Sequence, residues 1–322
     1  MVPREGRSNT DNQATVTSSP RELLHSYSEM RVNSRGKGRG VLIVGLSLGF
    51  LCFWSLLAAG GASDWQVLAP GMNLKYVTAK QPSSIGDSRI IILRMDPEQW
   101  QLEAVGASET GNSTGHTARA WSQIRNFSAA INAGMFAADY KTHLGYMGSS
   151  AHVNNSRPND YQSVAAFEPR NSQSLPRFHI FDLDAPGIHF QDILKDYSSI
   201  LQNLRLVKRP GLNRWSQQER KWSEAALGED DTGRILFIYS RSPFTMHDLS
   251  NELLAAGIGL VAAQHLEGGP EAQLYLHVGT LELEMYGSYE TAFRENDTNS
   301  AAWPVPNILG VRSRTSGRQG TS

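Results

Sequence analysis

The residues best suited to chemistry lie in the segment His265-Leu266-Glu267-Gly268-Gly269-Pro270-Glu271. Its two carboxylates, Glu267 and Glu271, flank a Gly-Gly-Pro turn at the end of an apolar strand. Paired glycines such as Gly268 and Gly269 let a ligand approach the backbone and expose N–H donors to an anion. A carboxyl group leaving an apolar strand can be desolvated, which raises its pKa toward that of a general acid. The same residues also fit a tight turn with solvated glutamates, so both interpretations stay open.

Three further polar segments are candidates for substrate binding. Asn132 and Gly134 end an apolar stretch, where an asparagine can position a sugar hydroxyl or satisfy its own turn. Arg157 lies in a polar loop and could clamp a phosphate bidentately, although ordinary polar loops have the same composition. Asn203 and Arg205 lie where polar residues meet a short predicted strand, and Arg205 is a second candidate for holding an anion.

Several kinds of site are not supported by the sequence. The nine histidines include no HExxH pair, and no GxSxG, phosphate-loop or dinucleotide motif occurs. The net charge of -1 and the scattered aromatic residues give no basis for nucleic-acid binding. The only cysteine, Cys52, lies in an apolar run, which excludes a cysteine nucleophile. We therefore expect no cofactor, no metal and no nucleic-acid partner.

The elements that must position these residues are mostly short strands. Apolar runs rich in β-branched residues predict strands over 89–94, 100–107, 129–131, 163–167, 178–183, 258–266 and 272–278. Residues 100–107 are expected to form a hairpin with 89–94. Helical spacing of apolar residues predicts a helix over 118–124.

The region from Ala225 to Tyr239 predicts a hairpin around Asp230-Asp231-Thr232-Gly233. A helix should follow, because Thr245 suits its N-terminal cap and Gly257 its C-terminal end. Strands thus outnumber helices. The predicted class is α+β, a single domain with a mixed, mostly antiparallel sheet flanked by helices.

The N-terminal part of the chain has a different composition. Residues 1–40 predict a disordered cytoplasmic leader. Residues 41–62 are uncharged and apolar, follow a basic stretch, and predict one transmembrane signal-anchor helix with the following chain outside the cytoplasm. A cleaved signal would instead give a periplasmic or secreted protein. The folded domain is then expected over 63–312, with a disordered tail at 313–322.

These motifs together resemble the phosphodiester glycosidase family. The likeness covers most of residues 64–312 and includes INAGMF, QNLRLV, the AALGEDDTGRILF hairpin, and HDLSNELLAAGI followed by AQHLEGGPEAQLYL. An uncharacterised periplasmic branch of the family is more similar still. Its four motifs occur here in order at Trp222-Ser223, Leu266 to Ala272, Gly287 to Thr291, and Trp303 to Asn307.

The resemblance implies recognition or hydrolysis of a sugar joined through its anomeric carbon to a phosphodiester. Two residues depart from the family pattern: Glu267 replaces the usual aspartate before Gly-Gly, and Glu224 occupies the place of an arginine. The resulting hypothesis is an extracytoplasmic hydrolase of a glycosyl phosphodiester or envelope saccharide. Glu267 would be its general acid or nucleophile, with Glu271 or Glu224 as the second carboxylate. The alternative is a membrane-anchored protein that binds saccharide without catalysis.

Overall fold

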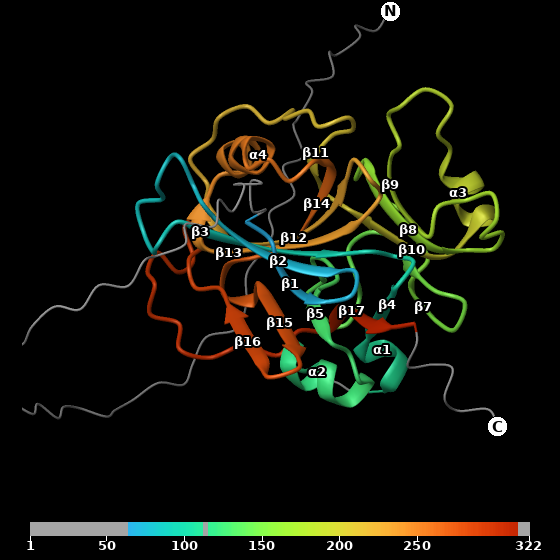
Figure 1. Cartoon of the computed structure of the whole chain (residues 1–322), viewed down its shortest axis with the longest axis horizontal. Coiled ribbons are helices and arrows are strands. Elements are labelled where there is room, and N and C mark those ends of the chain that lie inside the picture. Colours follow the sequence, from blue (N-terminus) through green and yellow to red (C-terminus); the bar gives the residue numbers. More distant parts are fainter. Residues whose placement is uncertain (1–63, 112–114, 315–322) are drawn as a thin grey trace, which may run out of the picture. The chain divides into compact units, whose positions relative to one another are not determined.

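The computed structural model describes residues 64–111 and 115–314 (Figure 1). The expected leader, the expected transmembrane segment at 41–62 and the last eight residues lie outside these ranges. Within the described ranges, no helix combines the length and apolarity that a membrane span requires.

The residues that the structure describes form three sheets, of which the largest has seven strands with only antiparallel pairings. In spatial order they are β1 (Gln66–Ala69), β2 (Met72–Thr78), β3 (Arg89–Met95), β13 (Ile235–Phe244), β12 (Trp222–Asp230), β14 (Leu260–Gly268) and β11 (Arg205–Val207). Strands β12 and β13 form the predicted hairpin, where Asp230 Oδ1 accepts the backbone N–H groups of Thr232 and Arg234. The side chain of Asp230 therefore stabilises the turn.

The other two sheets have five strands each and are also antiparallel in their pairings. The second sheet contains, in spatial order, β7 (Val153–Asn155), β6 (Met147–Gly148), β10 (Tyr197–Asn203), β8 (Ser163–Pro169) and β9 (Phe178–Asp182). The third contains β16 (Leu281–Tyr286), β15 (Gln273–Val278), β5 (Ala129–Asn132), β17 (Asn307–Ser313) and β4 (Trp100–Gly106).

The helices are short and lie at the outside of the sheets. They are α1 (Ala107–Thr110), α2 (Ala118–Arg125), α3 (Phe190–Asp196), α4 (Met246–Ala255) and the 3-10 turn η1 (Gly269–Glu271). Thr245 caps α4 as predicted, because its Oγ1 accepts the Asp248 N–H at 3.0 Å, and Gly257 follows the helix with φ of 64°. Figure 1 shows α4 against the first sheet and α2 beside the third.

A single large core joins the three sheets. Its buried members include Leu93 and Phe237 from the first sheet, Phe167 from the second, and Ile131 and Leu274 from the third. The opposite face of the first sheet packs a separate cluster against α4. Burial on both faces explains why β12, β13 and β14 each contain an uninterrupted apolar stretch, at 225–227, 235–239 and 260–263.

The structure refines the expected class. It is a mostly antiparallel domain with few helices, in three sheets where one was expected. The predicted hairpin of 89–94 with 100–107 is wrong: β3 pairs with β2 and β13, whereas β4 pairs with β17. The strand, turn and strand at 258–278 are present, but β14 and β15 belong to different sheets. The connecting η1 turn therefore bridges two sheets.

Candidate active site

The Gly-Gly-Pro turn lies where β14 leaves the first sheet beside the start of β12. In the register of this pair, Glu224 lies opposite Gly268 and Ala225 opposite Glu267. The pairing brings Glu224 and Glu267, far apart in the sequence, to the same end of the sheet. Each therefore has a backbone position fixed by strand pairing, next to register shifts at Trp222/Glu224 and Ala225/Ala226.

Both glycines of the turn are required by close neighbours. A Cβ at Gly268 would lie 2.6 Å from Cδ1 of Trp222, and one at Gly269 would lie 2.6 Å from Oε2 of Glu290. Gly269 also has φ of +63°, a conformation that side chains rarely adopt. The absence of a side chain at the two glycines thus lets the Trp222 indole and the Glu290 carboxylate pack against the turn.

Glu267 is the centre of a carboxylate cluster formed by Glu224, Glu267, Glu271 and Glu290. Burial raises the pKa of Glu267 well above its usual range, and the charges of Glu271, Glu290 and Glu224 raise it further. A hydrogen bond from the Gly268 N–H to Oε1, at 3.1 Å, opposes this rise only in part. The protonated form of Glu267 is therefore favoured compared with that of an exposed glutamate.

The neighbouring carboxyls are shifted in the same direction. Burial raises the pKa of Glu271 to about 7, with a further rise from the charge of Glu290. Burial also raises the pKa of Glu290, while His265 and Arg220 lower it by their charges. Adjacent carboxyls with unequal pKa values are an arrangement that supplies an acid and a base at one pH.

Glu224 is held differently from the other members of the cluster. Its side chain is buried, its Oε1 lies 2.6 Å from Nδ1 of His265, and its Oε2 accepts the Trp222 indole N–H at 2.6 Å. Because a carboxylate oxygen can only accept, Nδ1 of His265 donates this hydrogen bond to Glu224. With both carboxylate oxygens occupied, Glu224 serves to orient His265 and Trp222.

The amide side chains form a separate structural unit below the turn, here called the amide seam: Asn132, Asn203, Gln264 and Gln273, all buried. Asn132 donates to the Glu271 carbonyl at 2.9 Å and accepts the Gln273 N–H at 2.7 Å. Asn203 donates to the Ala133 carbonyl at 2.9 Å. Asn132 and Asn203 therefore join strand ends, and these bonds occupy the groups expected to contact a sugar.

Gly134 lies against the same seam. Its φ is +153°, and a Cβ there would collide with Oδ1 of Asn203 and Nε2 of His143. These two atoms are themselves hydrogen-bonded at 3.1 Å. Gly134 thus makes room for a buried hydrogen bond.

The two arginines expected to hold an anion are placed elsewhere. Arg205 forms ion pairs from Nη1 with Asp182 at 3.1 Å and with Asp184 at 2.7 Å, so its charge is already neutralised. Arg157 is exposed, and only its backbone N–H has a described contact, with Oδ1 of Asn155. No contact among the described residues links either side chain to the carboxylate cluster.

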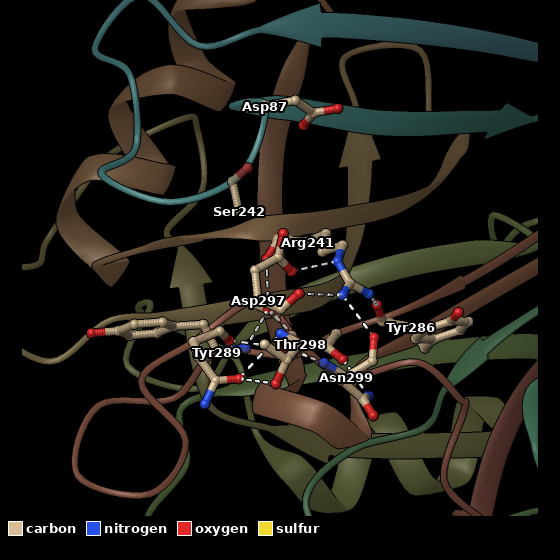
Figure 2. A network of polar contacts seen from close by, with 12 residues as sticks. Asp87, Arg241, Ser242, Tyr286, Tyr289, Asp297, Thr298 and Asn299 are labelled. Atoms are coloured by element: carbon tan, nitrogen blue, oxygen red, sulfur yellow. Dashed lines mark hydrogen bonds and ion pairs between the residues drawn. The ribbon is translucent and has the colours of Figure 1, made fainter. Parts of the chain in front are cut away.

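Glu290 belongs to the segment 287–299, here called the 287–299 loop. Figure 2 shows its anchor, the Arg241 guanidinium, which donates from Nε to Asp297 Oδ1 at 2.6 Å and from Nη2 to the Asn299 carbonyl at 2.9 Å. Arg241 Nη1 also donates to the Tyr286 carbonyl at 2.7 Å. One side chain of the first sheet thus fixes both ends of the loop.

A second anchor holds the start of the loop. Ser223 Oγ accepts the N–H groups of Ser288 at 3.0 Å and Tyr289 at 3.1 Å, and donates to the Arg241 carbonyl at 2.6 Å. Ser223 belongs to the Trp-Ser motif, and the loop begins with the Gly-Ser-Tyr-Glu-Thr motif. Two motifs that are distant in the sequence therefore form one structural unit beside the turn.

Some site residues were missed by the sequence reasoning. Glu290, His265, Trp222 and Tyr161 were not among the candidates, although the first three lie in motifs quoted above. Tyr161 lies close enough to Glu267 that the carboxylate charge adds to the effect of burial in raising the tyrosine pKa. Across 64–111 and 115–314, no group of three or more potential metal ligands is positioned to hold an ion.

Comparison with known proteins agrees with this fold. A family model described as phosphodiester glycosidase matches residues 125–312. The catalytic domain of zebrafish N-acetylglucosamine-1-phosphodiester alpha-N-acetylglucosaminidase, auto-inhibited by its pro-peptide, is similar with a TM-score of 0.53 and 12% identity, over 79% of this chain and 85% of that one. A hypothetical protein from Synechocystis gives 0.51 and 12%, over 76% of this chain and 62% of that one. No curated protein sequence matches.

At this identity the two solved structures establish a shared fold and nothing finer. The family match is independent of them and includes the Gly-Gly-Pro turn, the β12–β13 hairpin and the 287–299 loop. Because it extends over more than half of the 322 residues, this chain belongs to the phosphodiester glycosidase family.

Proposed function

We propose that this chain is an extracytoplasmic hydrolase that cleaves the anomeric bond of a glycosyl phosphodiester or of an envelope saccharide. The observation that carries the proposal is the pair Glu267 and Glu271, whose charges interact in a partly buried site of a phosphodiester glycosidase domain. When two carboxyls repel each other, one keeps its proton while the other ionises. Such a pair supplies both functions that glycoside hydrolysis requires.

Within this proposal, the different environments of the two carboxyls favour different roles. Glu267, whose pKa is the more strongly raised, carries the proton and gives it to the leaving oxygen as the glycosidic bond breaks. Glu271, with a pKa of about 7, is the carboxylate that attacks the anomeric carbon or activates a water molecule. Glu290 and the Glu224–His265 pair tune this proton distribution through their charges.

Membrane attachment is part of the proposal and depends on the sequence. The uncharged segment 41–62 follows a basic stretch, which favours a cytoplasmic N-terminus and a domain outside the cytoplasm. The substrate would then be a saccharide of the envelope or the surroundings. Membrane fractionation of the full chain, followed by protease treatment of intact cells, tests this orientation.

The decisive test of function is sugar release by purified residues 63–322. A panel of glycosyl 1-phosphodiesters and the matching 4-nitrophenyl glycosides, with N-acetylglucosamine among the sugars, is compared for the wild type, Glu267→Gln and Glu98→Gln. Glu98 is an exposed glutamate far from the turn, in the connection between β3 and β4. We expect release by the wild type and Glu98→Gln, and a loss of at least about 100-fold in Glu267→Gln.

The second candidate is a membrane-anchored protein that binds saccharide without turnover. It is favoured by Glu224, which stands where the resemblance expects an arginine and is occupied by His265 and Trp222. This candidate predicts calorimetric binding of a sugar with no release from any substrate. Full activity of Glu267→Gln, in contrast, would show that Glu267 is not catalytic. A hydrolase mechanism would then need a different carboxyl group as its acid.

A further inference from the structure

The carboxylate cluster poses an electrostatic problem for the proposed substrate. A phosphodiester carries a negative charge, and in the proposed site it must bind beside the ionisable carboxyls of Glu271 and Glu290. Like charges at such a site disfavour binding unless a cation lies near the anionic group. Arg205 is committed to Asp182 and Asp184, so a different cation is needed.

Arg220 lies at the edge of the cluster, and the backbone fixes its place. The residues that follow it pair with the 287–299 loop: the Thr291 N–H donates to the Lys221 carbonyl at 3.1 Å, and Trp222 bridges to Glu290. The Ser223 N–H donates to the Tyr289 carbonyl at 2.9 Å. Arg220 is therefore one residue beyond a short ladder that ends beside Glu290.

The side chains agree with this placement. The charge of Arg220 lowers the pKa of Glu290, so the guanidinium lies within electrostatic reach of the cluster. The neighbouring Lys221 is committed: its Nζ donates to Ser84 Oγ at 2.6 Å and lies 5.6 Å from the Tyr289 ring centroid. Arg220 itself is exposed, and its guanidinium forms no hydrogen bond or ion pair with another residue of 64–111 or 115–314.

We propose that Arg220 is the specificity-determining residue that binds the anionic phosphodiester group at the mouth of the carboxylate site. The inference rests on the proposed glycosidase function and assigns the leaving-group side of the site. An exposed guanidinium without a partner can form two parallel hydrogen bonds with a phosphoryl group. It would also offset the negative potential of Glu290.

The test compares an anionic and a neutral substrate of the same sugar. The sugar that the panel identifies, by release or by binding, is used as its methyl phosphodiester and as its 4-nitrophenyl glycoside. Arg220→Met should raise KM for the phosphodiester about tenfold or more and change KM for the nitrophenyl glycoside less than about twofold. Arg220→Lys should recover part of the affinity, because it restores charge but not the bidentate geometry.

Two further arginine variants serve as controls. Arg214→Met removes an exposed arginine from the same connection between β11 and β12, and should leave both KM values unchanged. Arg157→Met tests the remaining candidate with an exposed guanidinium. A selective rise in KM with Arg157→Met in place of Arg220→Met would overturn the proposal, as would an equal effect of Arg220→Met on both substrates.

Calorimetry separates this inference from the proposed function. The methyl phosphodiester is titrated into Glu267→Gln, and into Glu267→Gln combined with Arg220→Met. If the wild type releases no sugar yet binding weakens about tenfold on loss of Arg220, the hydrolase proposal fails and the role of Arg220 stands. If binding is equal in the two proteins, the role of Arg220 fails whether or not the wild type is active.

Discussion

Replacement of Glu271 by glutamine tests the electrostatics of the site through stability. Burial raises the pKa of Glu271 from its ordinary 4.5 to about 7. The folded state therefore binds a proton more tightly than the unfolded state. Stability contributed by the protonated carboxyl is present below about pH 4.5 and is lost as pH rises to about 7.

The expected magnitude follows from this difference. At about 1.36 kcal/mol for each pKa unit, the ionised carboxylate costs the folded state about 3 kcal/mol above pH 7. Glutamine has the same shape and never ionises. Glu271→Gln should thus exceed the wild type in free energy of unfolding by up to about 3 kcal/mol at pH 8, and by little at pH 4.5.

Urea unfolding of residues 63–322 between pH 4.5 and 8 measures this difference. The backbone carbonyl of Glu271, which accepts the Asn132 amide, is retained in the variant. Glu98→Gln serves as the control for loss of an exposed carboxylate, one that pairs with Arg177 at 2.6 Å on the surface. The reasoning is refuted if the Glu271→Gln difference is the same at pH 4.5 and pH 8, or if it shrinks as pH rises.

Other substitutions probe the parts that hold the site. Gly134→Ala should lower the free energy of unfolding by about 2 kcal/mol or more, because the added Cβ collides with Asn203, and thermal unfolding measures this loss. Arg241→Met should reduce kcat about tenfold or more, since the 287–299 loop loses its anchor, and limited proteolysis should then cut this loop first. Trp222→Phe leaves Glu224 Oε2 without its donor and should destabilise the domain by about 1–3 kcal/mol in urea unfolding, with normal stability contradicting the assigned contact.

The local elements of the fold were predictable because their determinants are near in sequence. The β12–β13 hairpin depends on Asp230 and Gly233 within its own turn, and α4 depends on Thr245 at its start. The pairing of β4 with β17 could not be predicted, because the two strands are neighbours in the sheet but far apart in the sequence. Alternation within a strand shows which face is buried but carries no information about its partner.

The candidate site divides in the same way. Glu267 and Glu271 could be proposed from the sequence because the Gly-Gly-Pro turn holds both. Glu290 could not, since its place depends on the contact of its loop with Gly269. Arg205 illustrates the converse. Its positive charge and its place in a polar segment suited an anion, but the packing of the strands pairs it with Asp182.

The amide seam has a consequence for engineering this scaffold. Each of its side chains already has hydrogen-bond partners in the protein, so the seam requires no ligand to complete it. Segments attached to the strand ends, such as the 287–299 loop, could therefore be exchanged for others without rebuilding the junction of the sheets. A library confined to these segments should retain folding while altering which molecules are accepted, with the seam as its constant frame.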